Sequence, residues 1–168
     1  MTFRKQSILV VDDDESVRAA VRNVLEGAGY NVVIAADAEE AVVRFTPEQI
    51  DLVLLDLNLP VRSGWEAFEQ LTTQHPTTPV IIITGMPDQY RTAQAAGVGA
   101  LIEKPIEVPP LLQTIEALLA EPCEARLRRL CGYQRDTRYL PPRGAAVPEK
   151  WHASAASPRQ RQRIERGS

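Results

Sequence analysis

The sequence predicts an α/β fold: a doubly wound parallel sheet in three layers. Five short apolar runs, rich in β-branched residues, cover residues 8–11, 32–35, 52–55, 80–83 and 101–102. Between and after them lie segments with helical apolar spacing, at residues 15–26, 38–45, 65–71, 88–96 and 108–119. Nearly continuous apolar runs are typical of strands covered on both faces. Their alternation with helices therefore predicts five βα units.

The first predicted helix has the clearest boundaries. Val17, Val21 and Leu25 recur at helical spacing, and Gly27 or Gly29 supplies the stop. An acidic residue just before or within the first turn is favoured by the helix dipole. The other helices show the same periodicity with less definite ends.

Charge divides the chain into two parts. Residues 1–120 hold 8 Lys+Arg against 17 Asp+Glu, net −9, whereas residues 121–168 hold 11 against 5, net +6. We therefore assign residues 1–120 to one domain, a length that can bury a substantial core. Residues 121–131 predict a short amphipathic helix. Residues 132–168 are basic and lack apolar periodicity, so we expect a disordered tail.

Polar side chains stand where the apolar runs end. Asp12 and Asp13 follow the first run, Asp56 the third, Thr84 the fourth and Lys104 the fifth. Because parallel strands end at one edge of a sheet, we expect these side chains to converge. Carboxylates about 4 Å apart repel by about 4 kcal/mol at an effective dielectric near 20, which favours a divalent cation between them. Oxygen-only ligands suit Mg²⁺, so the sequence predicts a magnesium-dependent phosphate site.

Each polar residue also has a simpler interpretation. The acidic residues at 12–15 can be a charge run at a helix start, and Asp56 can cap a loop. The order and spacing of all these residues along five βα units are more specific than any one of them alone.

Over about residues 6–120 the chain resembles the response-regulator receiver family of two-component signalling. The resemblance is carried by ILVVDDD, by LVLLDLNLP followed by Gly64, by VIIITG and by AGVGALIEKP. It implies a flavodoxin-like sheet with strand order 2-1-3-4-5. It also implies a cis peptide bond between Lys104 and Pro105.

The resemblance assigns a role to each site residue. Asp56 matches the phosphoryl acceptor, Thr84 the switch hydroxyl and Lys104 the family's lysine. Asp13 and Asp56 are implied to bind Mg²⁺ directly and Asp12 through water. The backbone carbonyl of Asn58 completes the metal set.

The resemblance implies a switch that catalyses its own phosphoryl transfer and dephosphorylation, and not an enzyme with a separate substrate. Its phosphoryl donor is a histidine kinase or a phosphotransfer protein, and its output is contact with a downstream protein target or a second copy in a homodimer. The output surface is implied to be the fourth helix, the fifth strand and the fifth helix. Receivers usually carry Tyr or Phe where this chain has Leu101, so we expect the output to use a reduced rearrangement or dimerisation in place of the usual aromatic readout.

The sequence is less typical of three other functions. The arginines of the basic tail favour phosphate contacts, which leaves DNA-binding transcriptional regulation as the alternative; solvation or contact with the acidic domain also accounts for them. A phosphatase of the haloacid-dehalogenase type needs an acid two residues after the nucleophile, where Asn58 stands, although Asp14 holds that place after Asp12. The sequence shows neither a GxGxxG nor a P-loop motif.

Composition limits location and metal chemistry. No secretory signal is recognisable and no apolar stretch is long enough to span a membrane, so we expect a cytoplasmic protein without membrane contact. Cys123 and Cys131 lack CxxC spacing, and His75 and His152 are isolated. A zinc or redox motif is therefore not expected.

Overall fold

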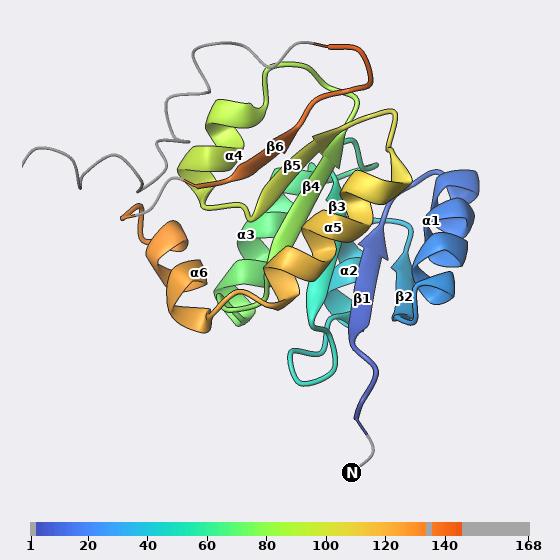
Figure 1. The fold of residues 1–168 in the computed structure, drawn as a ribbon, viewed down its shortest axis with the longest axis horizontal. Helices are drawn as coiled ribbons and strands as arrows, with labels where there is room; N and C mark the ends of the chain where they lie inside the picture. The colour runs from blue at the N-terminus through green and yellow to red at the C-terminus, as the bar shows by residue number, and fades with distance from the viewer. Residues whose placement is uncertain (1–2, 134–135, 146–168) are drawn as a thin grey trace, which may run out of the picture.

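The computed structural model describes residues 3–133 and 136–145, which form alternating strands and helices (Figure 1). The strands are β1 (Ser7–Val11), β2 (Asn31–Ala35), β3 (Leu52–Asp56), β4 (Val80–Thr84), β5 (Ala100–Glu103) and β6 (Arg138–Leu140). The helices are α1 (Glu15–Gly27), α2 (Ala38–Arg44), α3 (Gly64–Gln74), α4 (Tyr90–Ala96), α5 (Val108–Leu119) and α6 (Cys123–Leu130). The α/β class and all five predicted βα units are confirmed.

The strands form one parallel sheet in the order β2-β1-β3-β4-β5-β6. The predicted order 2-1-3-4-5 is confirmed and is extended by β6, which pairs with β5 so that Tyr139 lies opposite Leu101. The expected disorder from residue 132 onward is therefore wrong for this strand. Its three residues are too short to form an apolar run, and their order comes from the edge of β5. Residues 134–135 and 146–168 of the expected tail lie outside the described residues.

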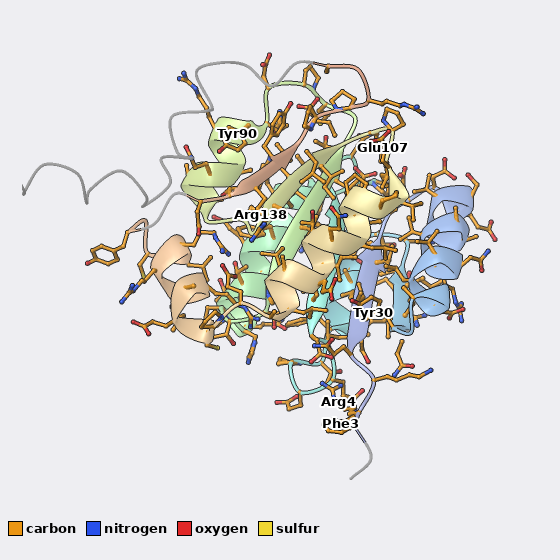
Figure 2. The ribbon with its side chains drawn as sticks, in the orientation of Figure 1. Phe3, Arg4, Tyr30, Tyr90, Glu107 and Arg138 are labelled. Atoms are coloured by element: carbon orange, nitrogen blue, oxygen red, sulfur yellow. The ribbon has the colours of Figure 1, made fainter. Side chains whose placement is uncertain are left out.

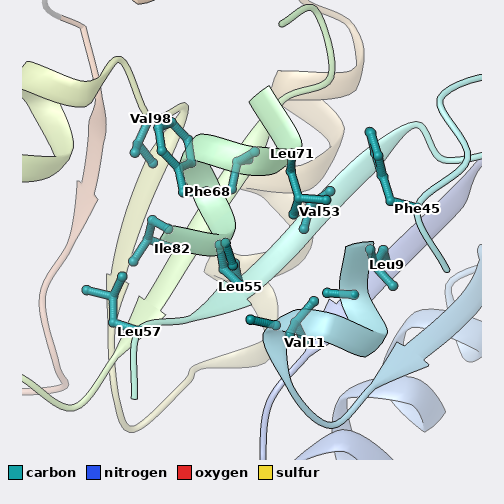
Figure 3. Close-up of a cluster of buried hydrophobic side chains, with 14 of the residues drawn as sticks. Leu9, Val11, Phe45, Val53, Leu55, Leu57, Phe68, Leu71, Ile82 and Val98 are labelled. Atoms are coloured by element: carbon teal, nitrogen blue, oxygen red, sulfur yellow. The ribbon is translucent and has the colours of Figure 1, made fainter. Parts of the chain in front are cut away.

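Two apolar clusters sandwich the sheet, because alternate residues of a strand point to opposite faces. One cluster lies between the sheet and helices α2, α3 and α4, and Figure 3 shows Leu9, Leu55 and Phe68 within it. The other lies under α1 and α5 and includes Ile8, Leu25 and Ile115. Burial on both faces explains why the strands are nearly continuous in apolar character.

Side chains and backbone conformation set several helix ends. Asp14, Asp37 and Ser63 each accept a hydrogen bond from an amide in the first turn of α1, α2 and α3. The fourth helix begins at Tyr90, not at residue 88 as predicted, because Asp88 has a φ of 60°, which is left-handed and not helical.

The short helix expected within residues 121–131 is present as α6. Its buried side chain is the charged Arg129 and not an apolar residue. Arg129 is buried and contacts both Glu121 and Asp136. Helical spacing puts Cys123 and Cys131 on the face expected to be apolar, but both cysteines are exposed. Leu130 packs against the cluster under α4. Within the described residues, no helix combines the length and the apolar character that crossing a membrane requires.

Candidate functional site

The predicted site residues meet at the carboxyl edge of the sheet. Asp12 directly follows β1, Asp56 ends β3, Thr84 ends β4 and Lys104 directly follows β5. The parallel register places these ends side by side, with Asp56 opposite Ile83 and Thr84 opposite Glu103. The site is thus built from four separate βα units by the sheet itself.

Three carboxylates form the acidic part of this site. One oxygen from each of Asp12, Asp13 and Asp56 lies within 4.8 Å of the others. Asp12 and Asp56 are only 4% and 3% exposed, whereas Asp13 is open to solvent. Three carboxylates against the single ammonium of Lys104 leave two negative charges. An oxygen-only donor set with that surplus fits Mg²⁺.

Lys104 bridges the two buried carboxylates. Its Nζ donates to Oδ2 of Asp12 and to Oδ2 of Asp56, both at 3.0 Å. Burial works against the charged ammonium, but the hydrogen bonds and charges of the two aspartates outweigh it and raise the pKa of Lys104. The lysine therefore carries its charge at neutral pH. The Lys104–Pro105 peptide bond is cis, as the resemblance implied.

Asp56 is held through both carboxylate oxygens. The amide of Asn58 donates to Oδ1 at 3.0 Å, while Oδ2 accepts from Lys104. Burial raises the pKa of Asp56 and the charge of Asp12 adds to this, against the opposing effect of the two hydrogen bonds. A dry site that disfavours excess negative charge gains from a bound cation. The role of the Asn58 carbonyl in metal binding remains a prediction.

Thr84 is fully buried beside these carboxylates, and its hydroxyl oxygen is tied to the next loop. Oγ1 of Thr84 accepts a hydrogen bond of 2.9 Å from the amide of Met86. The backbone of Thr84 also accepts from the amide of Lys104 at 2.8 Å. A rotation of the Thr84 side chain would therefore release the start of the loop that leads to α4.

Asp14, the residue that kept a phosphatase interpretation open, serves the helix. Its Oδ1 accepts from the amide of Ser16 at 2.8 Å, from the hydroxyl of Ser16 at 2.5 Å and from the amide of Val17 at 3.3 Å. The Ser16 hydroxyl bond, followed by the amide bonds, lowers the pKa of Asp14. A carboxylate held in its charged form as a helix cap is poorly suited to act as a general acid.

Sequence reasoning gave no structural role to two residues that shape the site. Gly64 lies so close to the end of β3 that an added Cβ would come within 2.3 Å of the carbonyl oxygen of Asp56. Arg18 donates from Nη1 to the carbonyl oxygen of Asp12 at 2.6 Å. A glycine shortly after a strand is a weak signal, and a helical arginine is none, so neither contact was predictable.

Two arginines of the basic segment point into the protein and not toward a ligand. Arg126 donates to the carbonyl oxygens of Thr77, Leu118 and Glu121 at 2.9–3.0 Å. Arg129 is only 3% exposed. These two arginines therefore help to hold α6 against the domain and are not free to contact the phosphates of a nucleic acid.

Comparison with known proteins finds a family match that covers nearly all of the five βα units and all the predicted site residues described above. The family model described as "Response regulator receiver domain" matches residues 8–116. The transcriptional regulatory protein YxdJ of Bacillus subtilis is 37% identical over 113 residues, 66% of this chain and 48% of that protein. Response regulator RR06 of Streptococcus pneumoniae is 32% identical over 67% of this chain and 52% of that protein. The chain therefore spans about half the length of these curated relatives.

Solved structures agree with the sequence match. A CheY-like response regulator receiver domain protein from Methanospirillum hungatei is 33% identical, covers 69% of this chain and 94% of that chain, and gives a TM-score of 0.65. The response regulator protein TrrA of Thermotoga maritima, solved in complex with Mg(2+)-BeF, is 26% identical over 67% of this chain and 98% of that chain, with a TM-score of 0.63. The family match stops at residue 116, ahead of α6 and β6.

Proposed function

Because the chain belongs to the response regulator receiver domain family of two-component systems, we propose that it is a magnesium-dependent phosphorylation switch with Asp56 as the phosphoryl acceptor. The observation that carries this proposal is the position of Asp56. It is a buried carboxylate, bonded to Lys104 at 3.0 Å, within a cluster of three acids. A loop-capping role accounts for its bond to Asn58 but not for the lysine and the neighbouring acids.

In the proposed reaction a carboxylate oxygen of Asp56 attacks the phosphorus of a phosphohistidine or of a small acyl phosphate. A P–O bond to Asp56 forms while the P–N bond to imidazole, or the P–O bond to the acyl group, breaks; the imidazole takes up a proton, and an acyl leaving group departs as its carboxylate. The nucleophile needs no general base, because the carboxylate carries its own electron pair. Lys104 stabilises negative charge on the phosphoryl oxygens, and the amide of Asn58 holds the carboxylate in place.

Asp12, Asp13 and Asp56 would hold Mg²⁺, with the Asn58 carbonyl as a further ligand. A bound Mg²⁺ neutralises charge on the transferred phosphoryl group. Removal of the metal is therefore expected to stop transfer without unfolding the protein.

The product changes the charge of the site. An aspartyl phosphate brings close to two negative charges and several strong acceptors. The hydroxyl of Thr84 can turn to donate to one of these oxygens, which breaks its bond to Met86 at the start of the β4–α4 loop. Lys104 can follow its partner carboxylate. The chemical step is thus converted into a movement of the loop and of α4.

We place the phosphoryl donor on an apolar groove next to the site. The groove has a volume of about 310 Å³ and lies between α1 and α5, lined by Val17, Ala20, Val24 and Leu111 and reaching Lys104. A helix of a histidine kinase or phosphotransfer protein seated there would bring its phosphohistidine to the edge that holds Asp56. Ala20→Glu is expected to slow transfer from a phosphorylated phosphotransfer domain at least tenfold while leaving phosphorylation by acetyl phosphate unchanged. Equal slowing with both donors would contradict this placement.

Intact mass spectrometry after incubation with acetyl phosphate tests the acceptor. One phosphoryl adduct is expected in the presence of Mg²⁺, none after chelation and none in Asp56→Asn. Asp37→Asn is the matched control, because Asn caps a helix as well as Asp does and Asp37 caps α2 without belonging to the cluster of three acids. An adduct of equal yield in Asp56→Asn would remove Asp56 as the acceptor.

DNA binding by the basic segment is not favoured. YxdJ, a transcriptional regulatory protein, extends over about twice the length of the match. The inward contacts of Arg126 and Arg129 leave fewer cations for phosphate groups.

A further inference from the structure

The last described strand closes the edge of the sheet with residues that the family match does not reach. We define the strap as residues 137–140, which includes β6; its backbone pairs with β5, and the amide of Arg138 also donates to the carbonyl of Gly99 at 3.1 Å. In Figure 1 the strap runs along β5, next to α4. Without it, the main-chain groups of β5 on this side would form an open sheet edge.

The strap is anchored to α4 and to the turn before β5. The Thr137 hydroxyl donates to the carbonyl of Val98 at 2.7 Å, and the Tyr90 hydroxyl donates to the carbonyl of Thr137 at 3.3 Å; both bonds are buried. The rings of Tyr90 and Tyr139 meet edge to face, 5.3 Å apart. Figure 2 labels Tyr90 on α4 and Arg138 on β6, the two elements that meet here. Tyr90 is thus held on one side by its helix and on the other by the strap.

A second set of contacts links the strap to the phosphoacceptor site. The hydroxyl of Tyr139 donates to Oε1 of Glu103 at 2.8 Å. Glu103 is paired with Thr84 in the sheet and immediately precedes Lys104. The strap is therefore bonded to Glu103, which is next to both Thr84 and Lys104, and the proposed function depends on these two residues.

From these contacts we propose that the strap is an intramolecular latch that favours the unphosphorylated state and is loosened by phosphorylation of Asp56. This inference rests on the proposed function. The strap fits the arrangement in which Thr84 accepts from Met86 and Tyr90 begins α4 four residues later. When Thr84 turns toward a phosphoryl group, that loop is released, and Tyr90 is displaced from Tyr139 and Thr137. Coupling between two sites is reciprocal. If a phosphoryl mimic bound at Asp56 weakens the strap, a substitution that weakens the strap must make the mimic bind more tightly.

Loosening of the strap uncovers the β5 edge. Main-chain N–H and C=O groups of β5 that pair with β6 are then freed. Phosphorylation of Asp56 would thus expose the edge of β5 that pairs with the strap, outside the phosphoacceptor site.

Two measurements on the whole 168-residue chain test the latch, with Tyr139→Phe as the variant. This change removes the hydroxyl that bonds Glu103 but keeps the ring on Tyr90. Tyr133→Phe is the matched control, because Tyr133 is 87% exposed at the end of α6. A second variant, Thr137→Val, removes the buried bond to Val98 and guards against an effect peculiar to position 139.

The first measurement is the equilibrium affinity for beryllofluoride with Mg²⁺, a phosphoryl mimic, by calorimetry. Tyr139→Phe and Thr137→Val are expected to bind it about fivefold more tightly than the wild type, at the lower end of typical couplings between sites, and Tyr133→Phe equally tightly. The second is amide hydrogen exchange of the peptide covering residues 137–142, which is expected to speed up when beryllofluoride binds to the wild type.

Each outcome has a separate meaning. If the wild type binds the mimic while both strap variants match Tyr133→Phe, or bind more weakly, the latch is overturned and the proposed function stands. Unchanged or slower exchange of the strap on binding also overturns the latch. If Asp56→Asn takes up a phosphoryl group from acetyl phosphate as well as the wild type does, the proposed function fails first.

Discussion

Replacing Gly64 with alanine is expected to damage the site and the fold together. A Cβ at this position would lie 2.3 Å from the carbonyl oxygen of Asp56 and 2.6 Å from the Cα of Leu57. Both neighbours are backbone, so restoring an ordinary contact of 3.4 Å requires a shift of roughly 1 Å at the end of β3. Overpacking of this kind costs about 3 kcal/mol. The same shift displaces the residue proposed to accept the phosphoryl group, which is expected to slow phosphorylation by about 100-fold.

Urea denaturation measures the first effect, and the rate of adduct formation with acetyl phosphate measures the second. Gly27→Ala is the matched control, because an added Cβ at this helical glycine meets nothing within 4 Å. It is expected to stabilise the protein by about 0.5–1 kcal/mol through helix propensity and to leave phosphorylation unchanged. If Gly64→Ala matched Gly27→Ala in both assays, the close packing of the loop on Asp56 would be refuted.

Three further substitutions test other parts of the structure. Lys104→Met removes the cation that competes for the buried carboxylates, so it is expected to raise Mg²⁺ affinity at least about tenfold in a calorimetric titration while abolishing phosphorylation. Val61→Gly is expected to raise the free energy of unfolding by about 0.5–1 kcal/mol, because this exposed β-branched residue has a φ of 67°. Arg129→Met is expected to lower the free energy of unfolding by about 3 kcal/mol, since it strips the buried cation from two carboxylates.

Each control makes the same amino-acid replacement at a position that lacks the structural feature being tested. Val43→Gly lies within α2 and is expected to destabilise, the opposite of Val61→Gly. Arg128→Met removes an exposed cation and is expected to change stability by less than about 0.5 kcal/mol. Lys104→Met with unchanged Mg²⁺ affinity would show that the lysine and the metal do not share carboxylates. If Arg129→Met and Arg128→Met changed the free energy of unfolding equally, the stabilising role of the buried Arg129 would be contradicted.

The sequence predicts best where burial is uniform. The central strands lie between two layers of helices, so almost every side chain is apolar and the run is visible without any partner. The carboxyl-edge residues follow directly from this, because once Leu52–Asp56 and Val80–Thr84 are strands in one parallel sheet, Asp56 and Thr84 must stand at the same edge. The start of α1 next to Asp14 was likewise readable from local chemistry, because acidic residues favour the first turn of a helix.

Prediction failed where a distant partner provides the order. The strand Arg138–Leu140 carries a charged residue, spans three positions and is followed by two prolines, so its own pattern is that of a loop. Its structure depends on β5 and on contacts of Tyr139 with Tyr90 and Glu103, all far away in the chain. The helical periodicity of α6 was readable, but its buried Arg129 was not, because only the fold shows that two carboxylates surround it.

The most direct test of the central claim is to locate the phosphoryl group chemically. Borohydride reduces an aspartyl phosphate to homoserine, and peptide mass spectrometry then identifies the modified position. After treatment with acetyl phosphate and Mg²⁺, homoserine is expected at position 56 and nowhere else, and it is expected to disappear when Mg²⁺ is chelated. Homoserine at another aspartate, or at position 56 to the same extent without Mg²⁺, would contradict the account.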